Sequence, residues 1–393
     1  MPYFDIDPLL ETMLDVAPVV SDLNLSVGKP PQVEVDGQLR GVPYASVDRL
    51  MPYHTELVAM RLLRGKKDLA DRLVTTGSAD LSYSLPQRTR FRVNIFSQRG
   101  TYSIVLRVIP NKIPTVEELG IPKQLEEITR ERNGIVLVTG PTGSGKSTTL
   151  ASLINKMNHE KAIHIVTIED PIEYLYLNEV ATINQREIGT DTENFANALR
   201  AALRQAPKVI LVGEMRDVET ISTALEASET GHLVLSTLHT IDAAKTIDRI
   251  VGVFPKDEER QIRTRFAQSF KWIVSQKLIP RKGGGRRAIC EILRANSRTR
   301  EYIQQGEREG KSLTDAMEDG ALDGMQTFDG ELDRLVEEGA LDVEEALTYA
   351  TNPTNLRLRL ASHSQETAEG GVEVSQDAAA VGSGSEMDDM IER

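Results

Sequence analysis

Residues 134–157, GIVLVTGPTGSGKSTTLASLINKM, are the most informative segment of this sequence. An apolar run leads into a glycine-rich turn, and a helix-forming segment begins at Lys146. The turn matches the pattern GxxxxGK[ST], in which glycines let backbone N–H groups converge on phosphate oxygens at a helix start. A simple strand-to-helix turn is the structural alternative. The position of the glycine-rich turn between an apolar run and a helix favours a nucleotide-phosphate site.

We predict that this loop binds ATP. Lys146 is expected to reach the β- and γ-phosphates, and the Ser147 hydroxyl is expected to hold Mg²⁺. The predicted nucleotide-binding residues are consecutive: Gly140, Pro141, Thr142, Gly143, Ser144, Gly145, Lys146, Ser147 and Thr148.

Three further apolar runs follow the loop: IHIVTI (163–168), KVILVG (208–213) and HLVLST (232–237). Short, continuously apolar runs that alternate with amphipathic helices are typical of parallel strands covered on both faces. The sequence therefore predicts an α/β domain with a parallel sheet. From residue 256 to 361 it predicts mostly helices, with one strand near residues 287–293.

Acidic and histidine side chains flank these runs. Glu214 follows KVILVG, and Glu169 and Asp170 follow IHIVTI. The carboxyl ends of parallel strands meet at one edge of a sheet, where a carboxylate can act on water beside a γ-phosphate. A histidine beside a strand is more often structural; here His239 is predicted at the phosphate edge and His232 at the opposite end of its strand.

Residues 1–110 have a different pattern, that of a mixed α/β module. A hairpin is predicted at Asp36-Gly37, a helix at 51–63, and two strands in RFRVNIFS and TYSIVLRVI. The alternation of apolar residues along these two strands places Arg92 and Arg107 on the polar face of the sheet. Solvation alone would explain two such arginines.

The predicted boundaries follow composition. We predict a domain over 1–110, a short proline-bounded linker over 111–114, a second domain over 115–361, and a disordered acidic tail over 362–393. The tail carries eight acidic residues and one basic residue and has no aromatic residue. It cannot bury enough apolar surface to fold by itself; an acidic docking segment is the alternative.

Composition excludes several classes of protein. The single cysteine, Cys290, rules out a disulfide framework and a four-cysteine zinc site. No apolar run approaches the roughly 18 residues of a membrane span, and the acidic N-terminus is unlike a signal peptide. We expect a cytoplasmic protein. Although the net charge is −13, residues 256–287 hold ten basic and three acidic residues, which leaves a nucleic-acid translocase as an alternative.

Four segments, in order, resemble the Walker A, Asp box, Walker B and His box of the PilT-type pilus retraction ATPases of the secretion ATPase superfamily. They are GPTGSGKSTTLASLI, TIEDPIEY, ALRQAPKVILVGEMRD and ETGHLVLSTLHTIDAAKTIDRI. The resemblance extends from about residue 21 to 335. It implies a homohexamer in which each chain has an N-terminal PAS-like domain and a C-terminal RecA-like ATPase domain. The related pilus extension ATPases carry a four-cysteine zinc motif, which this chain cannot form.

The resemblance also implies catalytic roles. Glu214 corresponds to the catalytic glutamate. The arginines correspond to fingers that contact the γ-phosphate of a neighbouring subunit, so hydrolysis would depend on ring assembly. The residues with implied catalytic roles are Glu214, Glu169, Asp170, His239, His232, Arg92 and Arg107.

The function implied is an ATPase motor that powers type IV pilus retraction, and hence twitching motility, by hydrolysis-driven domain rotation. Its implied partners are an inner-membrane pilus platform protein and a paralogous ATPase, and no stable nucleic-acid partner is expected. The alternatives are an accessory motor of the PilU kind, a nucleic-acid translocase, and a small-molecule kinase or nucleotide-dependent scaffold without turnover. No acceptor site for a kinase is recognisable.

Overall fold

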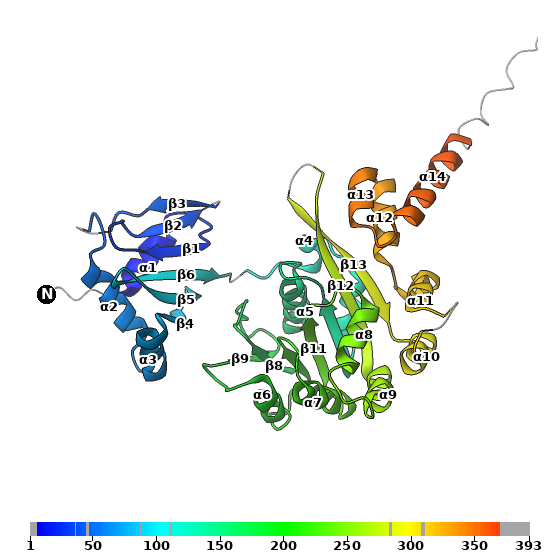
Figure 1. The fold of residues 1–393 in the computed structure, drawn as a ribbon, viewed down its shortest axis with the longest axis horizontal. Helices are drawn as coiled ribbons and strands as arrows, with labels where there is room; N and C mark the ends of the chain where they lie inside the picture. Colours follow the sequence, from blue (N-terminus) through cyan, green and yellow to red (C-terminus); the bar gives the residue numbers. More distant parts are fainter. Residues whose placement is uncertain are drawn as a thin grey trace, which may run out of the picture. The chain divides into compact units, whose positions relative to one another are not determined.

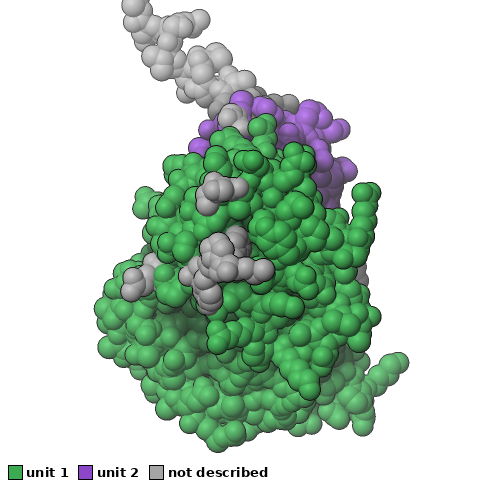
Figure 2. Space-filling view, turned by 90° about the vertical axis from the view of Figure 1, so that its left-hand side faces the viewer, with its two compact units in different colours: residues 1–278, 287–326 green, residues 279–286, 327–393 purple. Residues whose placement is uncertain are grey.

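The computed structural model describes residues 6–369, except 36, 45–46, 87, 111, 283–284 and 308–310. The chain divides into two compact units, of which the first comprises residues 1–278 and 287–326 (Figure 2). The second comprises residues 279–286 and 327–393. The predicted limits of the N-terminal domain fall inside the first unit and remain a prediction.

The N-terminal part of the first unit holds a six-stranded sheet in the order β3-β2-β1-β6-β5-β4 (Figure 1). Its strands are β1 (Asp22–Leu25), β2 (Gln32–Val35), β3 (Gln38–Gly41), β4 (Ser78–Leu85), β5 (Thr89–Gln98) and β6 (Thr101–Ile109), and its helices are α1 (Ile6–Leu14), α2 (Pro52–Leu62) and α3 (Lys67–Thr76). The predicted hairpin, helix and strand pair are present; Asp36 itself lies outside the described residues. Neighbouring strands run antiparallel, and the alternate residues Phe91, Val93 and Ile95 are fully buried.

The second sheet has seven strands in the order β13-β12-β7-β11-β10-β8-β9. They are β7 (Gly134–Thr139), β8 (His164–Glu169), β9 (Thr182–Glu187), β10 (Val209–Val212), β11 (Leu233–Leu238), β12 (Phe270–Pro280) and β13 (Arg286–Arg294). The pairs from β12 through β7, β11, β10 and β8 to β9 are parallel. This arrangement confirms the predicted parallel sheet of a RecA-like domain.

Apolar layers cover both faces of this sheet. In β7, Ile135 and Leu137 pack into one layer, whereas Val136 and Val138 pack into the other. The first layer is covered by α6 (Phe195–Ala202), α7 (Val218–Glu229), α8 (Ala243–Val251), α9 (Glu259–Ser269), α10 (Ser297–Gln305) and α11 (Leu313–Asp319), and the second by α4 (Val116–Leu119), the 3₁₀ helix η1 (Lys123–Arg130) and α5 (Lys146–Glu160). A second 3₁₀ helix, η2, spans Ala321–Asp323. Burial on both faces explains why the strands read as continuous apolar runs.

One prediction is wrong. The segment QSFKWIVSQKL (268–278) lies within residues 256–361, for which the sequence predicts helices except near 287–293, but α9 ends at Ser269 and β12 begins at the next residue. Phe266 lies in α9 and Phe270 is the first residue of β12, and their rings stack across this junction with centroids 5.7 Å apart. The β-branched residues Ile273 and Val274 pair with β7 in the middle of the sheet.

Strand β9 was not expected either. Its sequence, TINQRE, has no apolar run because it is the last strand in the sheet order, and only two of its six residues are buried. Edge strands with one exposed face lose the pattern by which central strands are recognised.

In the described residues, the second unit contains α12 (Phe328–Glu337), α13 (Val343–Tyr349) and α14 (Pro353–Glu369). The disordered tail was predicted to begin at Ser362, yet α14 continues to Glu369. The residues SHSQETAE contain no proline or glycine that would end a helix before Gly370. Residues 370–393 lie outside the described part of the chain. None of the described helices is both long enough and apolar enough to cross a bilayer.

Candidate functional site

The glycine-rich loop joins β7 to α5, as predicted. Gly140 has φ +144°, and a Cβ there would lie 2.2 Å from the backbone oxygen of Gln276. Gly145, the residue before α5, has φ +90°. Side chains at these positions would collide or strain the backbone, so the tight turn requires glycine. The first turn of α5 then presents Lys146 and Ser147.

The Lys146 side chain lies across the loop. Its Nζ donates to the carbonyl oxygens of Gly140 and Pro141, each at 3.0 Å. Burial lowers the pKa of Lys146, while the charges of Glu173 and Glu214 oppose this shift. The ammonium group therefore lies within electrostatic reach of two carboxylates at the same edge of the sheet.

Thr148, two residues after Lys146, contacts the segment that follows β8. Its hydroxyl lies 2.9 Å from the Tyr174 hydroxyl. Tyr174 belongs to the predicted Asp box. The loop and the Asp box, about 30 residues apart in the sequence, therefore meet at this edge.

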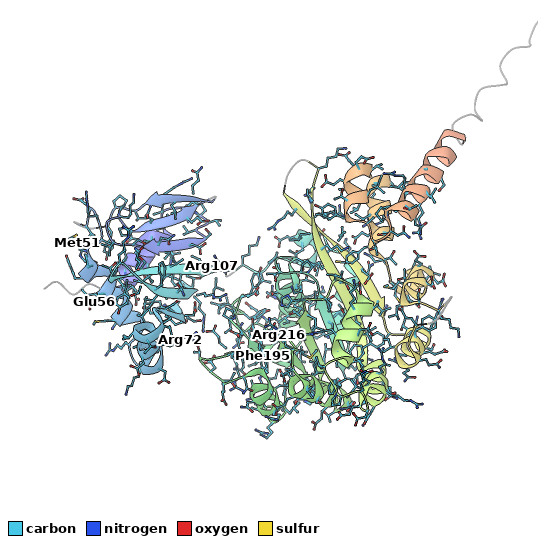
Figure 3. The ribbon with its side chains drawn as sticks, viewed as in Figure 1. Met51, Glu56, Arg72, Arg107, Phe195 and Arg216 are labelled. Atoms are coloured by element: carbon cyan, nitrogen blue, oxygen red, sulfur yellow. The ribbon has the colours of Figure 1, made fainter. Side chains whose placement is uncertain are left out.

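Glu214 follows β10 and lies between two side chains that can carry positive charge. Its Oε2 lies 2.6 Å from Nη2 of Arg216 and 3.7 Å from Nε2 of His239. Glu214 and His239, which were each expected at the phosphate edge, thus lie close to one another there. Arg216 was quoted within the Walker B segment but assigned no role, and Figure 3 labels it beside the second sheet.

The two acids of the Asp box differ in environment. Glu169 is buried and accepts hydrogen bonds from the Thr167 hydroxyl and from Gln185 Nε2, at 3.2 Å. Burial raises the pKa of Glu169, and these hydrogen bonds limit the increase. Asp170 is exposed. Glu169 therefore holds β8 and β9 together at this edge through its hydrogen bonds, while the side chain of Asp170 is accessible from solvent.

The structure does not bring His232 to this edge. Its Nδ1 lies 3.0 Å from the carbonyl oxygen of Ala227, and its backbone oxygen accepts from Gly134 at the start of β7. The six residues of β11 separate it from the phosphate edge, a length of roughly 20 Å. Within one chain, His232 and the phosphate loop lie at opposite ends of the sheet.

Arg92 and Arg107 face each other in the first sheet, at paired positions of β5 and β6. Both are exposed, as the strand alternation predicts. Nε of Arg107 donates to Asp22 Oδ1 at 3.0 Å, and Figure 3 labels Arg107 on β6. The two arginines therefore occupy paired positions on the polar face of that sheet, where Arg107 is ion-paired with Asp22.

The aromatic residues of the basic stretch 256–287 are not available to nucleic acid. Phe266, Phe270 and Trp272 are completely buried. Nε1 of Trp272 donates to Glu131 at 3.0 Å, and its ring lies 4.5 Å from the Arg294 guanidinium. Base stacking needs exposed rings, so this stretch lacks the aromatic platform of a single-strand binding protein.

Residues 32–348 match the sequence profile of the family described as Type II/IV secretion system protein. The match covers most of the chain. The chain belongs to this family.

Within the type II/IV secretion system family, the pilus retraction ATPases are close relatives. The type IV pilus retraction ATPase PilT of Pseudomonas aeruginosa is 44% identical over 335 residues, which cover 85% of this chain and 95% of that protein. The pilus ATPase PilU of the same organism is 37% identical and covers 89% of this chain and 90% of PilU. A crystal structure of the pilus retraction motor PilT with bound ADP has a TM-score of 0.79 at 40% identity, covering 90% of this chain and 99% of that one.

These likenesses confirm the predicted family, the fold class, and the assignment as an ATP-hydrolysing enzyme. Nucleotide binding is likewise confirmed at the level of the family. Sequence reasoning missed Arg216 and Gln276 at the phosphate edge. Arg216 could have been found, because it follows Glu214 by two residues in the Walker B segment. Gln276 could not, because it lies in a strand for which the sequence predicts a helix.

Proposed function

We propose that this chain is a Mg²⁺-dependent ATPase that forms a homohexamer and powers type IV pilus retraction. The main support is its likeness to PilT, which extends over 95% of that protein's length. The phosphate loop and Glu214 meet at one edge of the sheet, where such an enzyme needs them.

The residues of the loop bind and orient ATP. The Lys146 ammonium exchanges its bonds with the Gly140 and Pro141 carbonyls for bonds to the β- and γ-phosphates. Glu214 polarises a water molecule that attacks the γ-phosphorus as the bond to the β–γ bridging oxygen breaks. The products are ADP and inorganic phosphate, and the proton of the water passes to Glu214.

A magnesium ion fits this loop in its usual manner. Mg²⁺ in such enzymes relies on the nucleotide phosphates and very few protein ligands, and the first turn of α5 offers one suitable hydroxyl beside Lys146. Ser147, next to Lys146 at the start of α5, would hold it. Bound there, the ion would offset the negative charge on the phosphates.

Arg92 and Arg107 act as fingers on the nucleotide of a neighbouring subunit. Their exposed position on the first sheet suits a role outside their own chain, and Arg107 exchanges its pairing with Asp22 for a phosphate. Nucleotide state then sets the angle between the domain of residues 1–110 and that of residues 115–361 across the linker. Within this scheme, Asp170 and His239 contact the nucleotide side and Glu169 supports the Asp box.

His232 belongs to the His box of this scheme, although it lies at the far end of β11. We assign His232 a role in the assembled hexamer, in which a neighbouring chain would supply the group that contacts it. The remaining partners are an inner-membrane platform protein and a paralogous ATPase, which places the chain on the cytoplasmic side of the pilus machine. An accessory motor is the second candidate, because the likeness to PilU also covers 90% of that protein.

The test is complementation of a piliated bacterium that lacks its own retraction ATPase. The chain should restore pilus retraction and twitching, and Glu214→Gln should not. An accessory motor would restore them only when a second retraction ATPase is present. An active ATPase that restores nothing in either strain would refute the proposed function.

A further inference from the structure

Strand β12 continues past its pairing with β7 and runs beneath the phosphate loop. Ser275 is the register partner of Thr139, the last residue of β7. The next residue on each strand is Gln276 and Gly140, and the 2.2 Å between a Cβ at Gly140 and the Gln276 oxygen shows how closely the two backbones approach. Gln276 therefore lies directly against the start of the loop.

The Gln276 side chain bonds to both sides of the loop. Its Nε2 donates to the backbone oxygen of Ser144 at 2.7 Å, and its Oε1 accepts from the Thr149 hydroxyl at 2.8 Å. All three residues are at most 3% exposed. Because a carbonyl oxygen can only accept, the amide nitrogen must face Ser144, and this leaves the amide oxygen for Thr149.

These bonds determine where the loop's own N–H groups point. A trans peptide is planar, with its carbonyl and N–H on opposite sides. Anchoring the Ser144 oxygen to Gln276 therefore turns the Gly145 N–H away from Gln276. A phosphate loop binds its ligand through such N–H groups, so their direction before binding affects affinity.

We propose that Gln276 is a positioning residue that holds the phosphate loop in its nucleotide-binding conformation by bridging Ser144 and Thr149. The role requires a neutral amide. A glutamate at position 276 would place an acceptor against the Ser144 carbonyl, and a methionine would form neither hydrogen bond. A larger side chain would not fit beside Gly145, because even a Cβ added to this glycine would lie 2.8 Å from Gln276 Nε2. The inference depends on nucleotide binding by the loop and is independent of pilus retraction.

The experiment measures Mg²⁺-ADP affinity of the full-length chain by titration calorimetry, together with KM, kcat and thermal stability. In Gln276→Met, the dissociation constant and KM should rise about tenfold, a 1.4 kcal/mol effect of losing one buried amide bridge, while kcat at saturation stays within about twofold. Thr149→Val, which removes one hydroxyl, should weaken binding about threefold. The double variant should bind no more weakly than Gln276→Met, because both changes break one bridge.

Gln326→Met is the matched control. Gln326 is half-buried, and its Nε2 donates to the backbone oxygen of Cys290, on β13, at 2.7 Å. It should lose thermal stability without losing ADP affinity.

Wild-type affinity in Gln276→Met would overturn the proposal, as would an equal loss of affinity in Gln326→Met. If Gln276→Met fails to fold, unchanged binding in Thr149→Val would overturn it instead. A wild-type chain that binds no ADP would refute the nucleotide site and not this role of Gln276.

Discussion

Glu291 makes the stability of this protein depend on pH in an unusual direction. It is a buried carboxyl on β13, 7% exposed, which accepts from the Ala243 N–H at 2.8 Å and lies 3.3 Å from the Ser275 hydroxyl. Burial, aided by the nearby Asp242, raises the pKa of Glu291 from 4.5 to about 7, against the effect of Lys277 and of the two hydrogen bonds.

The sign follows from proton binding. Between pH 4.5 and 7 the folded protein holds a proton on Glu291 that the unfolded chain has released, so the free energy of unfolding falls as pH rises. A shift of about 2.5 pKa units corresponds to about 3 kcal/mol in total. Roughly 2 kcal/mol of this loss falls between pH 5.5 and 8. Below pH 4.5 both states hold the proton, so the pH dependence disappears and the stabilising contribution is complete.

Glu291→Gln removes the titration and keeps an oxygen for the Ala243 N–H. Its free energy of unfolding, relative to wild type, should therefore rise by about 2 kcal/mol from pH 5.5 to 8. Urea unfolding without nucleotide measures this difference. The single tryptophan, Trp272, is fully buried on β12, next to β13 in the sheet, and reports on this region by its fluorescence.

The same substitution at Glu117, an exposed carboxyl in α4, should leave the pH dependence unchanged. Parallel pH profiles for wild type and Glu291→Gln would refute the reasoning. So would a wild type that gains stability over the variant as pH rises, because the charged carboxylate would then be the favoured form.

Other predictions concern the loop and the ring. Lys146→Ala should weaken ATP binding more than about 100-fold, because its charge-assisted bonds to phosphate are lost; nucleotide titration measures this. Glu214→Gln should still bind ATP but lower kcat by about 100-fold or more, and retained turnover would exclude Glu214 as the catalytic base. Lys146→Ala and Arg107→Ala should each be inactive alone, while an equimolar mixture should recover about a quarter of the active sites if the finger acts between subunits. A mixture that stays inactive would contradict that arrangement. Gly140→Ala should lower stability by about 2–4 kcal/mol, since its Cβ meets the Gln276 oxygen; a thermal melt within 2 °C of wild type would contradict this.

Local patterns were sufficient for most of the fold. Each central strand of the second sheet is an apolar run because both of its faces are covered, so β7, β8, β10 and β11 could be predicted individually. The same holds for the alternation in β5 and β6, which placed Arg92 and Arg107 on one face. Where local and tertiary requirements coincide, a sequence is informative by itself.

Strand β12 shows where this fails. Its residues are apolar at spacings that suit a helix as well as a strand, and periodicity cannot separate the two in a short apolar run. The choice was made by pairing with β7, about 135 residues earlier in the chain. That pairing also placed Gln276 under the phosphate loop, which no motif indicated.

The sequence alone determined the chemistry of the loop, because its glycines and Lys146 act through backbone geometry within a few residues of one another. Which distant side chains contact that loop depends on the tertiary structure. It placed Gln276 against Ser144 and Thr149, and it placed Tyr174 beside Thr148. The physical reason is that strand order and register, which set these distances, depend on contacts among all the strands and leave no signal in any one segment.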